Sequence, residues 1–212
     1  MTRIEHILAE LARLYPDVKA QLDFRTPYEL LVATMLAAQS TDKQVNKVTP
    51  TLFATFPDVF AIAKLTPEEL LPYVKSCGFK SKATNIVNTS RILVEKYNGV
   101  VPQTLEELTE LPGVGRKTAN VVLANAFGIP TMAVDTHVFR VSNRLGLAHA
   151  KDVLHTEEQI MAVVPREDWI DAHHWMIFHG RQVCHARKPD CAHCTLTQWC
   201  EYYQQGEDEK GK

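Results

Sequence analysis

The chain has 212 residues, of which 45% are apolar and 23% are charged, and its formal net charge at pH 7 is −2. These values fit a globular protein with a substantial core in one or two domains, and they disfavour a strongly basic, general nucleic-acid binder. No apolar run approaches the roughly 20 residues that span a bilayer, and residues 2–14 lack the apolar region of a secretory signal, so we expect a cytoplasmic protein.

Helix-start signals recur along the first half of the chain. Residues 26–29 (Thr-Pro-Tyr-Glu) and 66–69 (Thr-Pro-Glu-Glu) each place threonine before proline, with glutamate three residues after the threonine, and 104–107 (Thr-Leu-Glu-Glu) reads as another capping box. Each precedes an amphipathic run, and Gly128 followed by Pro130 ends one such run. The pattern predicts an all-α fold of roughly ten short helices. Cys77, which has no partner motif, is expected to be a small buried residue.

The turn Gly113-Val114-Gly115 opens a predicted helix that starts with Arg116 and Lys117. Backbone N–H groups at such a turn can bind a phosphate, although a plain tight turn also explains the two glycines. Between residues 111 and 145 there are four basic residues against one acidic residue, a local net charge of +3. The turn and the local charge together point to nucleic-acid binding.

Lys117 and Asp135 lie 18 positions apart and supply an amine and a carboxylate. The positive potential of the helix N-terminus and of Arg116 favours a neutral amine, which can attack C1′ of an extruded nucleotide. Asp135 can stabilise positive charge at C1′ and can help to deprotonate Lys117. Each residue also has an ordinary interpretation, because Lys117 could be a solvated helix lysine and Asp135 a helix N-cap.

Four of the five cysteines fall near the C-terminus with the spacing C-x6-C-x2-C-x5-C: Cys184, Cys191, Cys194 and Cys200. Disulfides are disfavoured in a cytosolic protein of this length. Structural zinc sites usually pair two knuckles across a longer gap, whereas a compact array of four cysteines suits an iron–sulfur cluster. The spacing predicts a metal centre and favours iron–sulfur over zinc, which stays open.

Three motifs occur in a fixed order: Leu-Pro-Gly-Val-Gly-Arg-Lys-Thr-Ala at 111–119, Val-Asp-Thr-His-Val at 134–138, and the four-cysteine array. Together they resemble the endonuclease III family of DNA repair glycosylases, over the chain from about Leu8 to Cys200. The resemblance implies a six-helix domain at 22–130 with a helix-hairpin-helix, and a second domain from 1–21 and 131–212 holding a [4Fe-4S] cluster. It implies duplex DNA with damaged pyrimidines or abasic sites as partner, bound in a cleft between the domains by a monomer associated with the nucleoid.

The resemblance also implies roles for individual residues. Lys117 and Asp135 would be catalytic, making the protein a bifunctional glycosylase that removes oxidised pyrimidines such as thymine glycol and cleaves the abasic site by β-elimination. Gln39 would fill the gap left by the extruded base, and Phe79 would be the wedge, in a loop one residue shorter than the family's. Further DNA contacts, or residues lining the pocket, would be Asp42, Gly113, Val114, Gly115, Arg116, His137, Arg140, Arg187 and Lys188. A structural histidine at 137 and a flexible surface loop at 187–188 are the alternatives.

Two other functions share these motifs. An adenine-removing relative would have the same fold and cluster, but such relatives generally lack a lysine at the position of Lys117 and carry an extra C-terminal domain. A non-catalytic DNA-binding module would be expected to lack Lys117 or Asp135, and both are present. Residues 205–212 are expected to form a disordered tail.

Overall fold

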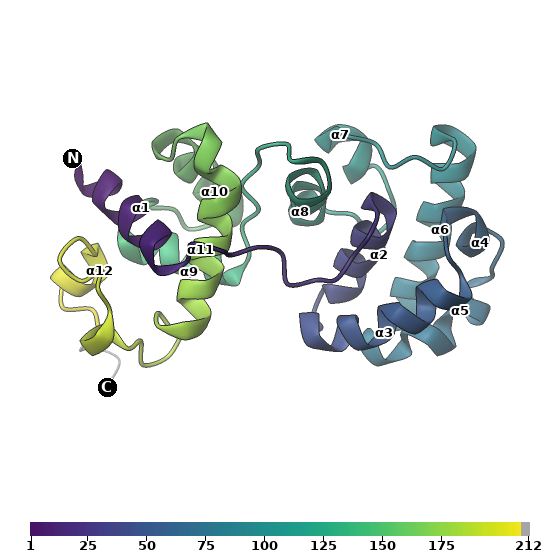
Figure 1. Ribbon diagram of the computed structural model, residues 1–212, viewed down its shortest axis with the longest axis horizontal. Helices are drawn as coiled ribbons and strands as arrows, with labels where there is room; N and C mark the ends of the chain where they lie inside the picture. Colours follow the sequence, from purple (N-terminus) through teal and green to yellow (C-terminus); the bar gives the residue numbers. More distant parts are fainter. Residues whose placement is uncertain (209–212) are drawn as a thin grey trace. The chain divides into compact units, whose positions relative to one another are not determined.

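The computed structural model describes residues 1–208, and every regular element in that range is a helix (Figure 1). The chain divides into two compact units, one formed by residues 20–129 and the other by residues 1–19 together with the chain from Pro130 onward. The all-α prediction is confirmed. No helix among the described residues is both long enough and apolar enough to cross a membrane.

The unit of residues 20–129 contains seven α-helices and one 3₁₀ helix; six helices were expected, and two of the seven are only five residues long. Its elements are α2 (Pro27–Ala37), α3 (Asp42–Thr55), α4 (Val59–Ala63), α5 (Pro67–Val74), η1 (Lys75–Cys77), α6 (Lys80–Tyr97), α7 (Leu105–Thr109) and α8 (Arg116–Phe127). Thr26, Thr66 and Thr104 each cap the helix that follows, as predicted. The reciprocal bond from a glutamate side chain to the cap backbone is present at Thr66 but not at Thr104.

Helix α2 lies at the centre of this unit and packs against α3, α6 and α8. An amphipathic helix was predicted here, but residues 28–36 are all buried, including Glu29 and Thr34. Such a helix is apolar on every side because neighbours surround it. The buried polar groups are satisfied locally, since the Thr34 hydroxyl donates to the Leu30 carbonyl at 2.7 Å and Arg25 donates to the Glu29 carboxylate at 3.2 Å. Cys77 is buried in the same core, as predicted.

The second unit contains α1 (Arg3–Leu14), α9 (Thr136–Leu145), α10 (Val153–Val163), η2 (Arg166–Asp168), α11 (Trp169–Gln182), η3 (Cys191–His193) and α12 (Glu201–Gln204). Helix α11 packs against α9 and α1 around a single apolar core. Arg3 joins the N-terminal helix to the distant C-terminal segment, because its guanidinium donates to the carbonyls of Leu145 (2.6 Å), Gly146 (2.9 Å) and Trp199 (3.0 Å).

The predicted disordered tail differs from the structure at residues 205–208. There the chain forms turns in which the N–H of Gln205 donates to the Glu201 carbonyl at 2.9 Å and the N–H of Glu207 to the Tyr202 carbonyl at 3.1 Å. Gly206 to Asp208 are partly buried. These backbone hydrogen bonds anchor the segment to α12, and the polar composition from which disorder was predicted gives no sign of them. The remainder of the predicted tail, 209–212, lies outside the described residues.

Candidate functional site

Helices α7 and α8 are joined by the tight turn that the sequence predicted. The N–H of Leu111 donates to the Leu108 carbonyl and the N–H of Val114 to the Leu111 carbonyl, both at 3.1 Å. The Thr89 hydroxyl of α6 supports the turn from below by donating to the Pro112 carbonyl at 2.9 Å. Because the Val114 side chain is buried, the turn is pinned to the core, and its backbone is held rigidly at the surface.

The two glycines of this turn are required for different reasons. Gly113 has a left-handed backbone (φ 75°), and a Cβ there would lie 2.7 Å from the Asn85 side-chain nitrogen. Gly115 has an ordinary extended backbone (φ −89°, ψ 179°), and a Cβ there would meet no atom within 4 Å. From the sequence, either phosphate approach or a plain tight turn could explain the two glycines. The conformation and packing of Gly113 already explain that residue, so only Gly115 leaves open space in front of the backbone.

Lys117 is the second residue of α8 and is exposed. Gly115 is the N-cap and offers no side-chain hydrogen bond to the first turn, so this helix end has no capping side chain. The Lys117 amine has no hydrogen-bond or ion-pair partner within residues 1–208. An amine without a carboxylate partner at the positive end of a helix is an accessible nucleophile once deprotonated.

Asp135 is the N-cap of α9, as the ordinary interpretation held. Its Oδ1 accepts a hydrogen bond from the Val138 N–H at 2.7 Å, and the side chain is half-buried. The second carboxylate oxygen, Oδ2, has no hydrogen-bond partner among the described residues. One carboxylate can therefore cap the helix and keep an oxygen available for chemistry.

His137 and Arg140, both predicted DNA contacts, pack against α11. Arg140 Nη2 lies 3.1 Å from His137 Nδ1 and donates to the Gly180 carbonyl at 3.0 Å, while Arg140 Nε donates to the Cys184 carbonyl at 3.0 Å. This guanidinium therefore fixes the start of the cysteine-rich segment. A phosphate contact through its remaining nitrogen, Nη1, stays a prediction.

Gln39 and Phe79 occupy exposed positions at two neighbouring loops of the residue 20–129 unit. Gln39 follows α2 with a left-handed backbone (φ 58°). Phe79 immediately precedes α6, and 76% of its surface is exposed. A large apolar side chain so exposed has no structural task within the described residues, which suits the predicted wedge. Asp42 begins α3 and engages a partner of its own.

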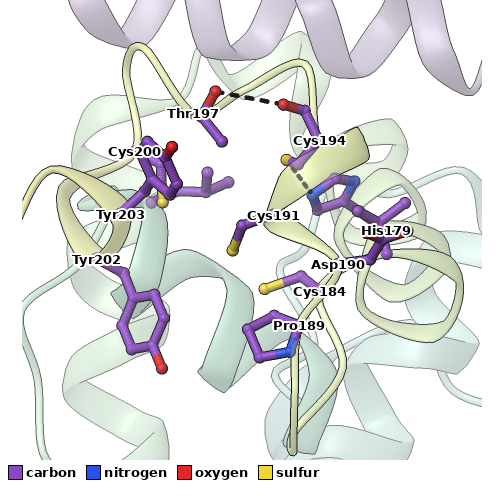
Figure 2. A pocket seen from close by; sticks show the side chains of 12 residues that line it. His179, Cys184, Pro189, Asp190, Cys191, Cys194, Thr197, Cys200, Tyr202 and Tyr203 are labelled. Carbon is purple, nitrogen blue, oxygen red and sulfur yellow. Dashed lines mark hydrogen bonds between the residues drawn. The ribbon is translucent and has the colours of Figure 1, made fainter. Parts of the chain in front are cut away.

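All four cysteines of the C-terminal array line one pocket, together with Leu145, His179, Pro189, Tyr202 and Tyr203 among others (Figure 2). It encloses roughly 330 Å³ free of protein atoms, part of it open to solvent. Burial raises the pKa of the Cys191 thiol to about 11, with Asp208 and the other cysteines adding to the shift. Burial likewise raises the pKa of Cys194 and Cys200. Thiolates in such a pocket need nearby positive charge or hydrogen-bond donors.

Two side chains from distant helices supply those donors. Arg144 of α9 donates to Cys184 Sγ at 3.3 Å, and its guanidinium stacks 4.6 Å from the Tyr202 ring centre. His179 of α11 lies 3.6 Å from Cys194 Sγ through Nε2 and 2.9 Å from the Tyr15 hydroxyl through Nδ1. Burial lowers the pKa of His179 to about 4, so the ring is neutral. If Tyr15 donates to Nδ1, then Nε2 carries the proton and donates to the sulfur.

The segment between Cys184 and Cys191 is held in place, although a flexible loop was one alternative. Arg144 donates to the carbonyls of His185 (2.7 Å) and Ala186 (3.0 Å), and the Asp190 N–H donates to the Val183 carbonyl at 2.9 Å. Arg187 and Lys188 project from this anchored segment and are exposed. The two basic side chains are therefore presented to solvent on a fixed backbone.

Four residues at these sites escaped the sequence analysis. His179 and Tyr15 carried no motif, and Arg144 was counted only as local charge. Lys82 was also missed, yet its amine contacts three backbone carbonyls beneath Gln39 and Phe79. Each of these side chains acts through a partner that is distant in sequence, and no local signal marks such a pair.

Residues 32–166 match the family model described as "HhH-GPD superfamily base excision DNA repair protein". The chain is 51% identical over 206 residues to endonuclease III of Haemophilus influenzae, with 97% of each chain covered. It is 46% identical to endonuclease III of Bacillus subtilis, covering 100% of this chain and 97% of the relative. The fold matches a solved structure of a trapped endonuclease III–DNA covalent intermediate with a TM-score of 0.91 and 44% identity, covering 98% of this chain and 99% of the other.

Proposed function

Because this chain belongs to the endonuclease III family of HhH-GPD base-excision repair proteins, and is thus a DNA glycosylase and abasic-site lyase, we propose Lys117 as its nucleophile and Asp135 as its catalytic carboxylate. The observation that carries the proposal is the Lys117 amine, which is exposed and without a partner among the described residues, two positions beyond the open backbone at Gly115. That amine is available to the sugar of a nucleotide whose phosphate lies against the turn.

The reaction begins when the neutral Lys117 amine attacks C1′ of an extruded nucleotide. The new C1′–N bond forms as the glycosidic bond breaks, and the base leaves with the bonding electron pair and is protonated. A proton then passes from the lysine nitrogen to O4′ as the C1′–O4′ bond opens and O4′ takes the bonding pair, which gives a protonated Schiff base and a 4′ hydroxyl. Removal of a C2′ proton then expels the 3′ phosphate and cleaves the strand. Hydrolysis of the imine finally frees the lysine.

Asp135 is assigned to the charge that develops at C1′ as the base departs. A carboxylate stabilises an oxocarbenium-like centre in the same way in glycoside hydrolysis. The cap bond from Val138 at 2.7 Å fixes the orientation of the carboxylate, so little reorganisation is required during the reaction. The substrate class that we propose is oxidised pyrimidines, with thymine glycol as the test case.

The remaining predicted residues are proposed as DNA contacts. Gly115 and the following N–H groups would hold a phosphate, with Gly113, Val114 and Arg116 shaping that turn. Gln39 and Phe79 would enter the duplex at the lesion, and Arg187 and Lys188 would contact the backbone from the anchored segment. His137 and Arg140 would support this surface.

We propose a [4Fe-4S] cluster as the cofactor, held by Cys184, Cys191, Cys194 and Cys200. The four thiols line one pocket, and their compact spacing along the chain suits a cuboidal cluster whose irons each take one thiolate. Arg144 and His179 lie within hydrogen-bonding distance of two of the sulfurs and would stabilise the bound thiolates. The cluster would supply a rigid, charged centre that organises the segment carrying Arg187 and Lys188.

The test of the function uses a duplex with one thymine glycol opposite adenine, and a second duplex with adenine opposite 8-oxoguanine. Base release and strand cleavage are measured separately for the wild-type protein. Release with cleavage on the first duplex alone supports the proposal. Release of adenine from the second duplex without cleavage would favour the adenine-removing alternative, and binding without release would favour a non-catalytic module.

A further inference from the structure

One nitrogen joins two loops in the unit of residues 20–129. The Lys82 amine, in the first turn of α6, donates to the carbonyl of Leu36 at 2.8 Å and to that of Cys77 at 2.5 Å, and it also contacts the carbonyl of Ala38. Leu36 and Ala38 belong to the C-terminal end of α2, whereas Cys77 ends η1. An ammonium carries three protons, so every donor of this group is used.

This arrangement satisfies groups that would otherwise lack partners. The last carbonyls of a helix accept no hydrogen bond from an N–H of the same helix. They also form its negative end, which favours a cation. Lys82 is partly buried, and this burial lowers its pKa. A lysine placed here purely for solubility would extend into water. Instead the side chain turns inward, and its ammonium group donates hydrogen bonds to backbone carbonyls of two loops.

Each loop continues directly into a side chain proposed to enter DNA. Gln39 follows Ala38 and has a left-handed backbone. Phe79 follows Cys77 after a single residue, Gly78, which has φ 135°. A Cβ on Gly78 would lie 3.2 Å from the Lys82 amine, so the glycine gives the amine room to reach the carbonyls. The position of Lys82 thus constrains the backbone next to both exposed side chains.

A second, weaker bridge joins the same region. The Gln44 side-chain amide of α3 donates to the Ser76 hydroxyl of η1 at 3.0 Å. This bond lies at the surface, where water competes for both groups, so the inward contacts of Lys82 contribute more to the rigidity.

We infer that Lys82 is a positioning residue that fixes the spacing between Gln39 and Phe79, so that both side chains can enter the duplex together at one lesion. The inference rests on the proposed function. Extrusion of a paired base costs unstacking and unpairing energy, and the inserted side chains must replace the lost contacts at once. If the two loops moved independently, Gln39 and Phe79 would less often be in place together to replace the lost stacking and pairing contacts.

The test compares Lys82→Met with Lys80→Met under single-turnover conditions. Methionine keeps the length and apolar body of Lys82 but removes the donors. Lys80 lies in the same turn, is exposed and, among the described residues, forms an ion pair with Glu68 alone. Its substitution removes the same charge. For Lys82→Met we expect excision of thymine glycol from a fully paired duplex to fall about tenfold or more, because small misplacements are costly. When the thymine glycol lies opposite a missing base, its extrusion breaks no base pair. The loss of excision rate should then be under about threefold.

A double-mutant cycle gives the second readout. In a Phe79→Ala background, Lys82→Met should cost much less than it does alone, because the residue that it positions is already gone. Additive effects, or an equal loss on both substrates, would overturn the inference, as would a lower melting temperature with normal excision. If Lys82→Met does not fold, Lys82→Gln, which keeps two donors, should show a smaller loss confined to the paired duplex. Failure of the wild type on the paired duplex would instead refute the proposed function.

Discussion

The Asp135 carboxylate accepts the Val138 N–H through Oδ1 at 2.7 Å and leaves Oδ2 without a partner among the described residues. The structural task of this side chain and its proposed chemical task would therefore fall on different oxygens. They can be separated by substitution, because asparagine caps helices about as well as aspartate does but carries no negative charge.

Asp135→Asn is predicted to fold normally and to lose base excision. The amide oxygen keeps the cap bond, so the melting temperature should shift by no more than about 3 °C. Excision of thymine glycol should fall at least about 100-fold, because charge stabilisation at C1′ is lost. Single-turnover rates and a thermal melt measure the two effects. Activity within about tenfold of wild type would exclude the catalytic role.

A change of glycine to serine is predicted to affect stability differently at the two glycines of the α7–α8 turn. Gly113→Ser should destabilise the fold by roughly 1–3 kcal/mol, because its backbone is left-handed and its Cβ would collide with Asn85. Gly115→Ser should leave stability unchanged or slightly raised, since the backbone is extended and serine is a good N-cap. Urea unfolding distinguishes the two.

The two variants should rank in the opposite order for DNA affinity, with Gly115→Ser the more impaired. At a temperature where both variants are folded, Gly115→Ser should bind abasic-analogue DNA more weakly than Gly113→Ser does, by about tenfold, because its side chain occupies the open space before the helix. Equal affinities would show that phosphate does not approach at Gly115.

Arg144→Met is predicted to make the proposed iron–sulfur cluster labile. The change removes the donor to Cys184 Sγ and both bonds to the carbonyls of the segment that carries Arg187 and Lys188. The visible absorbance of the purified protein should bleach several-fold faster in the presence of a chelator, and affinity for DNA should fall as the segment loosens. Arg166→Met is the matched control, because that exposed arginine stacks on Trp169 away from the cysteines. Equal bleaching rates would contradict the role of Arg144.

Acidification should destabilise the protein through His174. Burial, together with the charge of His173, lowers the pKa of His174 to about 4 in the folded state, whereas an unfolded histidine titrates near 6.5. Between these values the unfolded chain binds the extra proton, so stability is present above pH 6.5 and falls as the pH decreases towards 4. Between pH 7.5 and 5.5 the loss contributed by His174 alone should be roughly 1 kcal/mol. Urea unfolding at both values should show a smaller difference for His174→Gln, and an unchanged difference would contradict the assignment.

Local signals predicted those parts of the fold that depend on neighbouring residues. The threonine caps at 26, 66 and 104 and the stop at Gly128 are properties of four or five consecutive residues, and the structure has each of them. The full burial of α2 was missed, because a helix surrounded by neighbours and an amphipathic one share the same apolar positions. Its burial follows from the packing of α3, α6 and α8 around it.

The residues of the candidate site also fall into two groups, those with a local sequence signal and those without one. Gly115, Lys117 and the four cysteines occur in recognisable spacings, so they could be proposed as site residues from the sequence alone. Lys82 binds backbone carbonyls up to 46 positions away, and Arg144 binds those near Cys184 some 40 positions away. A carbonyl has no residue identity, so no sequence pattern reports which side chain will reach it. These supporting contacts emerge only from the folded chain.

The central claim is that the Lys117 amine forms the covalent bond to DNA, and borohydride trapping tests it most directly. The wild type, Lys117→Ala and Lys80→Met would each be incubated with a duplex carrying one thymine glycol, with borohydride present to reduce any Schiff base. The account predicts a covalent protein–DNA band for the wild type and for Lys80→Met, with none for Lys117→Ala. A band of equal intensity from Lys117→Ala would contradict the account, because another amine would then be the nucleophile.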